Sequence, residues 1–277
     1  MSKSFLHAGT FGDTIYGLNV IKLLGGGDLY IELNGMDKVA YNAWRAPNAG
    51  GHAGRYTQSD LDFLFPFLEH QSYVNNLSVW KNESVDYDLR NHYKFVADLE
   101  GGRRTGKYEN WQGNQTECYA LLCGIDTTTH RSDLLIKPWL SVDQSIRIPG
   151  KPIVINRTPR HIKRELANSP INEQWAHWIA EDSLEELAVF IGSKQEHDTF
   201  CQLHKCNIQY YPVSDMLEMA KVIQGCEQFI GNQSMPLSLA IGLGKTFWCE
   251  VRLDYENLKT PNGYGDVWFP RANGHYF

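Results

Sequence analysis

The amino-acid sequence predicts an α/β protein built from two Rossmann-like halves, each with a parallel sheet facing a shared cleft. Two observations lead to this prediction. The chain has 277 residues, a length that suits two α/β domains of about 130 residues each better than a single core. Strand-like and helix-like runs also alternate at the N-terminus, and the alternation starts again at Lys151. We therefore expect one domain at 1–148 and a second at 149–277.

The first half opens with a β-α-β pattern, which is typical of a parallel sheet. Ile15, Leu18 and Ile21 lie on one face of a predicted helix over 14–24, and a run of three glycines ends it. We expect strands over 5–7, 28–33 and 85–89, helices over 57–70 and 115–124, and an exposed glycine-rich loop over 101–114. Pro138 and the Pro149–Gly150 pair then mark a linker.

The second half begins with the apolar, β-branched run 152–156, the pattern of a strand buried inside a parallel sheet. Further strands are expected at 187–192, 208–211 and 228–231, with helices at 171–180, 183–187, 195–205, 216–223 and 236–242. This strict alternation is typical of a Rossmann-like unit. Neither half carries G-x-G-x-x-G after a strand or a P-loop, so the sequence does not predict a dinucleotide site.

Composition limits the partners and the location of the protein. The formal net charge is −6 and the pI is about 5.9, which argues against a surface built throughout for nucleic acid. Residues 1–24 lack the features of a secretory signal, and no run of about 18 apolar residues occurs. We therefore expect a cytoplasmic protein without a membrane span.

Two patterns raise the question of a metal site. The pair Cys201 and Cys206 encloses His204, but its spacing is looser than that of usual structural zinc sites. We interpret all six cysteines as reduced thiols. Asp86 and Asp88 formally match an Asp-x-Asp motif, and we interpret them as strand residues on one face. No metal is expected.

Four polar turns follow predicted strands, which is where ligands bind in open parallel sheets. The first turn contains Gly9, Gly12 and Asp13, immediately before a helix. Asp13 has two interpretations, because it can cap the helix or act as a general base in a cleft. Composition alone favours the cap.

The next two turns are basic. Arg157 and Arg160 follow the strand at 152–156, and guanidinium groups match the oxygens of a diphosphate. A solvated basic helix face is the alternative, and the position after a strand favours a phosphate clamp. Lys194 could reach the same phosphates. Glu196 either holds a ribose or base edge or stabilises the first turn of its helix, and the sequence does not decide between these roles.

The fourth turn, Asn232-Gln233-Ser234, precedes the helix that begins near Pro236. The N-terminus of a helix presents free N–H groups and a positive dipole end, so it can bind an anion. Ser234 can cap that helix at the same time.

Two of these segments resemble a known family. HAGTFGDTIYGLNVIKLLGGGDLYI resembles the opening of the heptosyltransferase-like glycosyltransferases (glycosyltransferase family 9 and its relatives), which begin with Ser/His-x-Gly-x-x-Gly-Asp before a helix. FIGNQSMPLSLAIGLGK resembles their C-terminal donor loop, which usually reads Asp-Ser/Thr-Gly. The segments at 151–161 and 192–197 also match, whereas 35–140 matches only loosely. The resemblance implies a GT-B fold, in which 258–277 could cross back to the first half.

The resemblance also implies roles for individual residues. Asp13 matches the catalytic base, and Asn232 stands where the family usually carries Asp. Glu218 falls near a position that contacts the nucleoside. The donor would be a nucleotide-diphosphate sugar, transferred with inversion and without a metal or other cofactor. The residues implied at the turn beside the base and at the donor-diphosphate loop are Gly9, Thr10, Phe11, Gly12, Asn232, Gln233 and Ser234.

The acceptor stays open. A glycan or lipopolysaccharide-type hydroxyl is the family default. Basic residues interleaved with aromatics in the loop 101–111 raise the alternative of a phage-type enzyme acting on hydroxymethylated bases in DNA. A third alternative is a non-catalytic nucleotide-sugar binding protein, which Asn232 alone favours. The residues that would contact DNA are Arg103, Arg104, Lys107 and Trp111.

Overall fold

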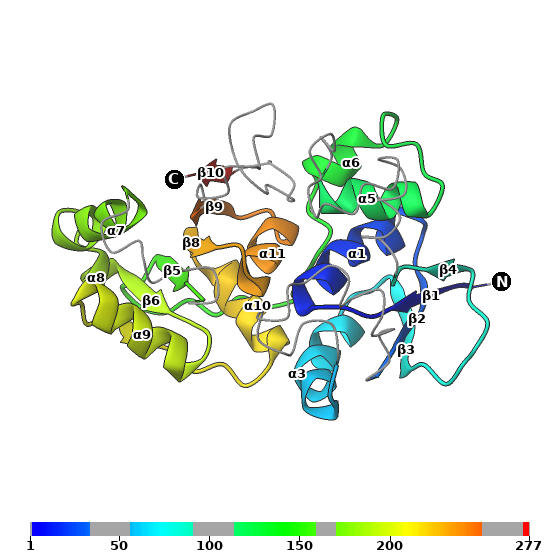
Figure 1. The fold of residues 1–277 in the computed structure, drawn as a ribbon, viewed down its shortest axis with the longest axis horizontal. Coiled ribbons are helices and arrows are strands. Elements are labelled where there is room, and N and C mark those ends of the chain that lie inside the picture. Colours follow the sequence, from blue (N-terminus) through cyan, green and yellow to red (C-terminus); the bar gives the residue numbers. More distant parts are fainter. Residues whose placement is uncertain (1, 34–55, 91–113, 159–169, 251–273, 277) are drawn as a thin grey trace, which may run out of the picture.

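The computed structural model describes residues 2–33, 56–90, 114–158, 170–250 and 274–276, and its core is two parallel β-sheets covered by helices (Figure 1). This arrangement confirms the predicted α/β class.

The first sheet has the order β3-β2-β1-β4, and every neighbouring pair is parallel. The central strand β1 is apolar and buried, as the β-α-β opening predicts. The edge strand β3 was not predicted, because Asn75, Asn76 and Ser78 interrupt its apolar pattern where it faces solvent. The bounds are Lys3–His7 for β1, Gly27–Ile31 for β2, Val74–Val79 for β3 and Tyr87–Asp88 for β4.

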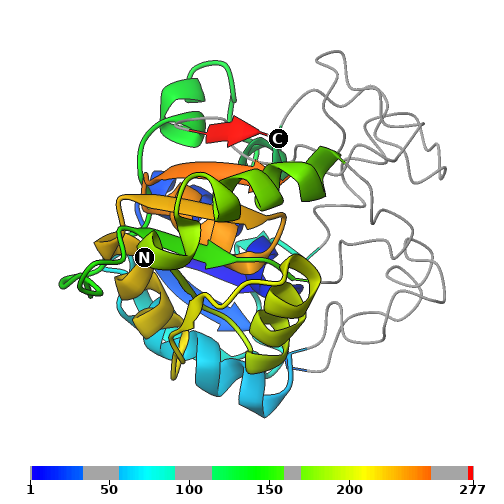
Figure 2. The same ribbon diagram turned by 90° about the vertical axis from the view of Figure 1, so that its left-hand side faces the viewer.

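The second sheet has the order β10-β9-β8-β5-β6-β7, again with all neighbours parallel. Figure 2 shows β10, β9, β8 and β5 one below another in this sheet. The strands β9 and β10 were not predicted from the sequence. The bounds are Ile153–Asn156 for β5, Ala188–Phe190 for β6, Gln209–Tyr210 for β7, Gln228–Asn232 for β8, Thr246–Glu250 for β9 and Gly274–Tyr276 for β10.

Within the described ranges the helices match the predicted positions closely, and one short helix there, α6, was not predicted. Several begin with a capping box, in which a side chain and a backbone N–H at each end of the first turn bond reciprocally. The bounds are Phe11–Leu23 for α1, Gln58–Glu69 for α3, Gln115–Leu122 for α5, Arg131–Leu135 for α6, Pro170–Ala180 for α7, Leu184–Leu187 for α8, Lys194–His204 for α9, Met216–Gly225 for α10 and Met235–Gly242 for α11.

Helices from the two halves pack on each other, α1 against α11 and α3 against α10. The segment joining the two sheets is held to this interface. Gly242 O accepts hydrogen bonds from the backbone N–H groups of Trp139 and Leu140, both at 3.0 Å, and the Trp139 indole donates to Ile15 O at 2.9 Å. A Cβ at Gly242 would lie 2.4 Å from Leu140 Cδ1, so a larger residue at this position would force the Leu140 side chain to shift.

The C-terminal segment expected to cross back is described only over 274–276. These residues form β10, which pairs with β9 at the edge of the second sheet. Residues 258–273 lie outside the described part of the chain, and their path stays a prediction. Among the described residues, no helix combines the length and apolarity that a membrane crossing requires.

Candidate functional site

The turn after β1 holds Asp13 at the carboxyl end of the first sheet. Gly9 adopts φ +146°, a conformation that side-chain-bearing residues rarely adopt, and Thr10 is the N-cap of α1. Thr10 N donates to Asp13 Oδ2 at 3.0 Å, and Asp13 N donates to Thr10 Oγ1 at 3.4 Å. Asp13 therefore takes part in capping, but as the third residue of α1 in a capping box whose N-cap is Thr10 and not Asp13 itself. Phe11 is the first residue of α1, and its ring packs against those of Tyr56 and Phe63.

Asp13 has a second partner that the sequence analysis missed. The Gln115 Nε2 amide donates to Asp13 Oδ1 at 2.6 Å, and both side chains are buried. Each carboxylate oxygen therefore accepts a bond within the protein. The local signal for Gln115 was its position directly after the cap Asn114, but nothing in the sequence indicated that α5 would lie beside α1.

The Asp13 turn faces the beginning of α11 across the two halves. A Cβ placed on Gly12 would lie 3.9 Å from Ser238 Oγ and 4.0 Å from Met235 Cα. The N-termini of α1 and α11 thus meet. Ser234 is the N-cap of α11, and its side chain makes no capping hydrogen bond there. Backbone N–H groups of the first turn of α11 are consequently suited to an anion beside the buried carboxylate.

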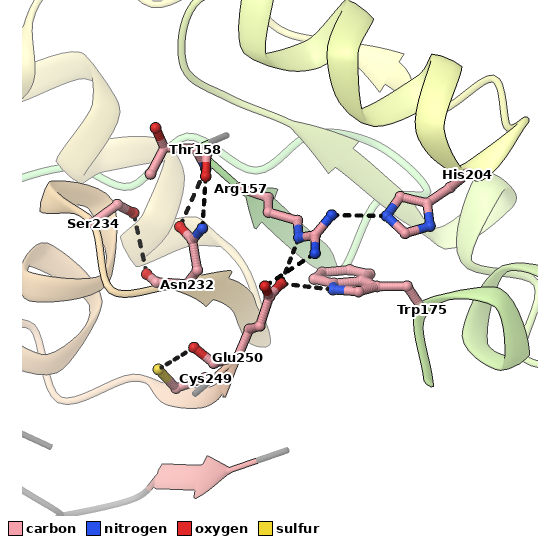
Figure 3. Close-up of polar contacts among 8 residues, drawn as sticks. All are labelled: Arg157, Thr158, Trp175, His204, Asn232, Ser234, Cys249 and Glu250. Carbon is pink, nitrogen blue, oxygen red and sulfur yellow. Dashed lines mark hydrogen bonds and ion pairs between the residues drawn. The ribbon is translucent and has the colours of Figure 1, made fainter. Parts of the chain in front are cut away.

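Hydrogen bonds connect the predicted donor loop, residues 232–234, to the end of β5 (Figure 3). Asn232 is buried, and its amide bonds twice to the backbone of Thr158: Thr158 N donates to Oδ1 at 3.2 Å, and Nδ2 donates to Thr158 O at 2.8 Å. Ser234 Oγ donates to Asn156 Oδ1 at 2.9 Å. The amide of Asn156 in turn donates to Ile191 O, at the end of β6, at 2.9 Å. These bonds hold three strand ends together.

This geometry explains why residue 232 is Asn. Replacing Asn232 by Asp would remove the donor to Thr158 O and place a carboxylate oxygen against that carbonyl. We expect Asn232→Asp to lower the free energy of unfolding by about 1–3 kcal/mol, because a buried bond is lost and an acceptor is left without a donor. Urea unfolding measures the change.

The matched control for this substitution is Asn75→Asp, because the amide of Asn75 bonds to Ser2 Oγ in an exposed position. The control should unfold like the original protein. Equal stability of Asn232→Asp and the original protein would contradict a structural role for the amide.

Arg157 does not have the solvent-facing position expected of a phosphate clamp. Its side chain is buried, and its guanidinium is paired with Glu250 on β9 by bonds of 2.5 Å from Nε and 3.0 Å from NH2 (Figure 3). Trp175 Nε1 also donates to Glu250, at 2.9 Å. The structure thus places the Arg157 guanidinium against a buried carboxylate, and a role of Arg157 as a phosphate clamp stays a prediction.

His204 completes this cluster. Its Nε2 lies 3.0 Å from Arg157 NH1. Burial, with a smaller contribution from the charge of Arg157, lowers the pKa of His204 to about 4. The ring is therefore neutral at pH 7 and can accept a hydrogen bond from the guanidinium. His204 is thus part of the ion-pair cluster. All six cysteines are free in the structure, and their reduced state in the cell stays a prediction.

Three other predicted site residues, Lys194, Glu196 and Glu218, each pair with neighbouring groups of the protein. Lys194 is exposed and pairs with Asp198 one turn further along α9. Glu196 accepts from Ser193 N at 2.9 Å, which confirms its role in the first turn of α9. Glu218 accepts from Ser214 N at 2.7 Å and from the Tyr211 hydroxyl at 3.1 Å. A nucleoside contact by Glu218 would thus have to share its carboxylate with these two donors.

The other predicted features are Gln233, a set of residues outside the described ranges and the absence of a metal site. Gln233 lies half-buried at the turn between β8 and α11. Arg160 lies outside the described residues, and so does the loop proposed to contact DNA, with Arg103, Arg104, Lys107 and Trp111. Among the described side chains, no group of three or more His, Cys, Asp or Glu gathers as metal ligands would.

Comparison with solved structures defines the class of fold. The whole chain superimposes on GT-B glycosyltransferases of family 9, at sequence identities that establish the fold alone. No protein-family model matches the chain, and no curated protein matches it in sequence.

Three particular structures illustrate the likeness, each with a TM-score of 0.55 and all of this chain covered. A family 9 glycosyl transferase from Veillonella parvula is 10% identical, with 85% of its length covered. The Escherichia coli ADP-heptose lipopolysaccharide heptosyltransferase II is 13% identical, with 90% covered. The E. coli heptosyltransferase WaaC, solved with ADP-2-deoxy-2-fluoro heptose, is 11% identical, with 93% covered.

Proposed function

We propose that the protein is an inverting, metal-independent glycosyltransferase that moves a sugar from a nucleotide-diphosphate donor to a hydroxyl of a glycan or lipopolysaccharide-type acceptor. The observation that carries the proposal is the meeting of two opposite electrostatic features: the carboxylate of Asp13 and the N-terminus of α11. The fold of the similar structures supports it. The first half, 1–148, would hold the acceptor, and the second half, 149–277, would hold the donor.

Asp13 would act as the general base. Its carboxylate accepts the proton of the acceptor hydroxyl as that oxygen attacks the anomeric carbon, and the bond to the nucleoside diphosphate breaks with inversion. Gln115 orients the carboxylate by its 2.6 Å hydrogen bond. Gly9, Thr10, Phe11 and Gly12 would shape the turn around it.

The leaving diphosphate gathers negative charge, and fixed dipoles near it would stabilise this charge without reorganisation. The first turn of α11 supplies such dipoles, with Gln233 and Ser234 in front of it. Lys194 and Arg160 are candidates for additional positive charge, and Glu218 stays a candidate for the nucleoside. Arg157 contributes by holding the ends of β5 and β9 together. A cytoplasmic location stays a prediction.

A thermal-shift screen of nucleotides tests this proposal. ADP, GDP, UDP, CDP, dTDP and their monophosphates are added to the protein, and ADP is the first choice because two of the similar proteins carry ADP-sugars in their descriptions. We expect one diphosphate to raise the unfolding midpoint more than its monophosphate does, since a ligand that binds only the folded state stabilises it by mass action.

Two glutamine substitutions locate the bound nucleotide. Gln233→Ala should weaken the diphosphate shift, because Gln233 lies in the loop before α11. Gln58→Ala makes the same change on the exposed side of α3 and should leave the shift intact. If no nucleotide diphosphate stabilises the protein at millimolar concentration, the glycosyltransferase proposal is wrong.

A further inference from the structure

A second polar cluster lies at the carboxyl end of the first sheet and is not used by the mechanism above. Asp88 ends β4, where it pairs in register with Leu6 of β1. Glu32 follows β2, and its backbone N–H donates to His7 O at 2.9 Å. The two carboxylates therefore flank the end of β1, directly below the turn that carries Asp13.

Arg90 spans the end of β1 between these carboxylates. Its Nε and NH2 groups donate to the two oxygens of Asp88 at 2.9 and 2.7 Å, and NH1 donates to Glu32 Oε1 at 2.9 Å. The guanidinium lies 4.7 Å from the centre of the Trp80 ring, within the range of a cation–π contact. These bonds fix Arg90 in one orientation.

One oxygen atom in this cluster lacks a hydrogen-bond donor among the described residues. Glu32 is only 8% exposed. Its Oε2 is buried, and no described residue provides a hydrogen-bond partner for it. A buried acceptor without a donor is costly, and a ligand hydroxyl that donates to this atom would remove that cost. Arg90 donates three of its five N–H groups in the bonds above, which leaves two N–H donors on the same guanidinium.

The chemistry of the ligand follows from these groups. The cluster contains two carboxylates and one guanidinium, so its formal charge is −1 and it repels a phosphate. The pKa of Asp88 is raised by burial, but its bonds to Arg90 outweigh this and leave that pKa below its usual value, so the negative charge persists at neutral pH. A hydroxyl both donates and accepts, and it can therefore satisfy Glu32 Oε2 and an Arg90 N–H together.

We propose that Glu32, Arg90 and Trp80 form a binding subsite for an uncharged sugar, with a sugar hydroxyl donating to Glu32 Oε2. The aromatic ring provides an apolar wall beside the polar groups, as is common in small-molecule sites. The inference rests on the proposed function in that the bound sugar would be the acceptor, held at the base of the turn that carries Asp13.

Ligand-observed NMR tests the subsite on the intact protein. The probes are the methyl glycosides of glucose, galactose and mannose, and the 6-phosphates of the same three hexoses, each at millimolar concentration. We expect at least one neutral glycoside to bind and the corresponding 6-phosphate to bind more weakly, because of the negative cluster. Binding of no neutral glycoside, or equal or tighter binding of the phosphate, overturns the proposal.

The variant Glu32→Gln provides a second test of the subsite. Glutamine keeps an oxygen for Arg90 but replaces the free acceptor by an NH₂ donor, so the affinity for the neutral glycoside should fall roughly tenfold or more. Glu69→Gln, the same change at an exposed position of α3, should leave the affinity unchanged. An unchanged affinity in folded Glu32→Gln overturns the proposal, and the comparison of probes on the original protein decides the matter should this variant fail to fold.

The same samples separate this inference from the proposed function. The diphosphate thermal shift is measured on the original protein and on Glu32→Gln, where we expect it to persist because Glu32 lies at the sheet of the other half. A diphosphate shift without glycoside binding overturns the subsite alone. Glycoside binding without any diphosphate shift supports the subsite and overturns the proposed function.

Discussion

Asp13→Asn is expected to lower the turnover number of sugar transfer by roughly 10²–10⁴-fold, the usual contribution of a general base. The KM for the nucleotide sugar should change little, because the proposed donor site lies at α11 in the second half. The folded structure should persist. Asparagine keeps one oxygen for Thr10 N–H, and its amide can donate to the Gln115 side-chain oxygen once that amide rotates. Steady-state kinetics with the nucleotide sugar found in the thermal-shift screen measure both constants.

The chain offers a matched control for the capping role of Asp13. Thr57 and Asp60 form the same capping box at the start of α3, with Thr57 N donating to Asp60 Oδ2 at 2.8 Å. Asp60→Asn and Asp13→Asn should therefore lose a similar amount of stability, about 0.5–2 kcal/mol at most. Only Asp13→Asn should lose activity. Equal loss of turnover in the two variants would show that Asp13 acts through the fold and not as a base.

Glu250→Ala is expected to lower the free energy of unfolding by about 3–5 kcal/mol, since it leaves the buried guanidinium of Arg157 without its carboxylate. That is a large fraction of the 5–15 kcal/mol that typically separates folded from unfolded domains. The Trp175 indole would also lose its acceptor on Glu250. Urea unfolding followed by tryptophan fluorescence measures the change.

Two further variants serve as controls for this prediction. Asp198→Ala breaks the exposed ion pair with Lys194 and should have little effect on stability, because solvent screens charges there. Replacing both buried partners, Arg157→Met with Glu250→Leu, should recover much of the loss, since no uncompensated charge remains. Near-original stability of Glu250→Ala would contradict a structural pair and would return Arg157 to consideration as a phosphate ligand.

Local chain chemistry made Asp13 predictable. A carboxylate three residues after Thr10, in the first turn of an apolar helix, is a capping pattern that depends only on neighbours in sequence. The same applies to the strand at 153–156, whose apolar residues indicate burial wherever the strand is placed. The unpredicted strand β3 is the counterexample, because an edge position lets polar residues occupy a strand.

Long-range contacts made the other residues unpredictable. Arg157 follows a strand as a phosphate ligand would, and only the pairing of β8 with β9 brings Glu250 close enough to bury it. Gln115 lies 102 positions from Asp13, and only the packing of α5 on α1 brings their side chains together. The partners of a polar side chain depend on which segments become neighbours, and residue type does not report this.

The sequence by itself thus determined the α/β class, the positions of most helices and central strands, and the turns at which ligands are expected. These features follow from hydrophobic periodicity, glycine conformation and capping, which act within a few residues. The tertiary structure decided which polar residues of those turns are buried in ion pairs and which surround the meeting point of α1 and α11. The reason is that burial and long-range pairing, and not residue type, determine whether a charged group is paired inside the fold or stays available to a ligand.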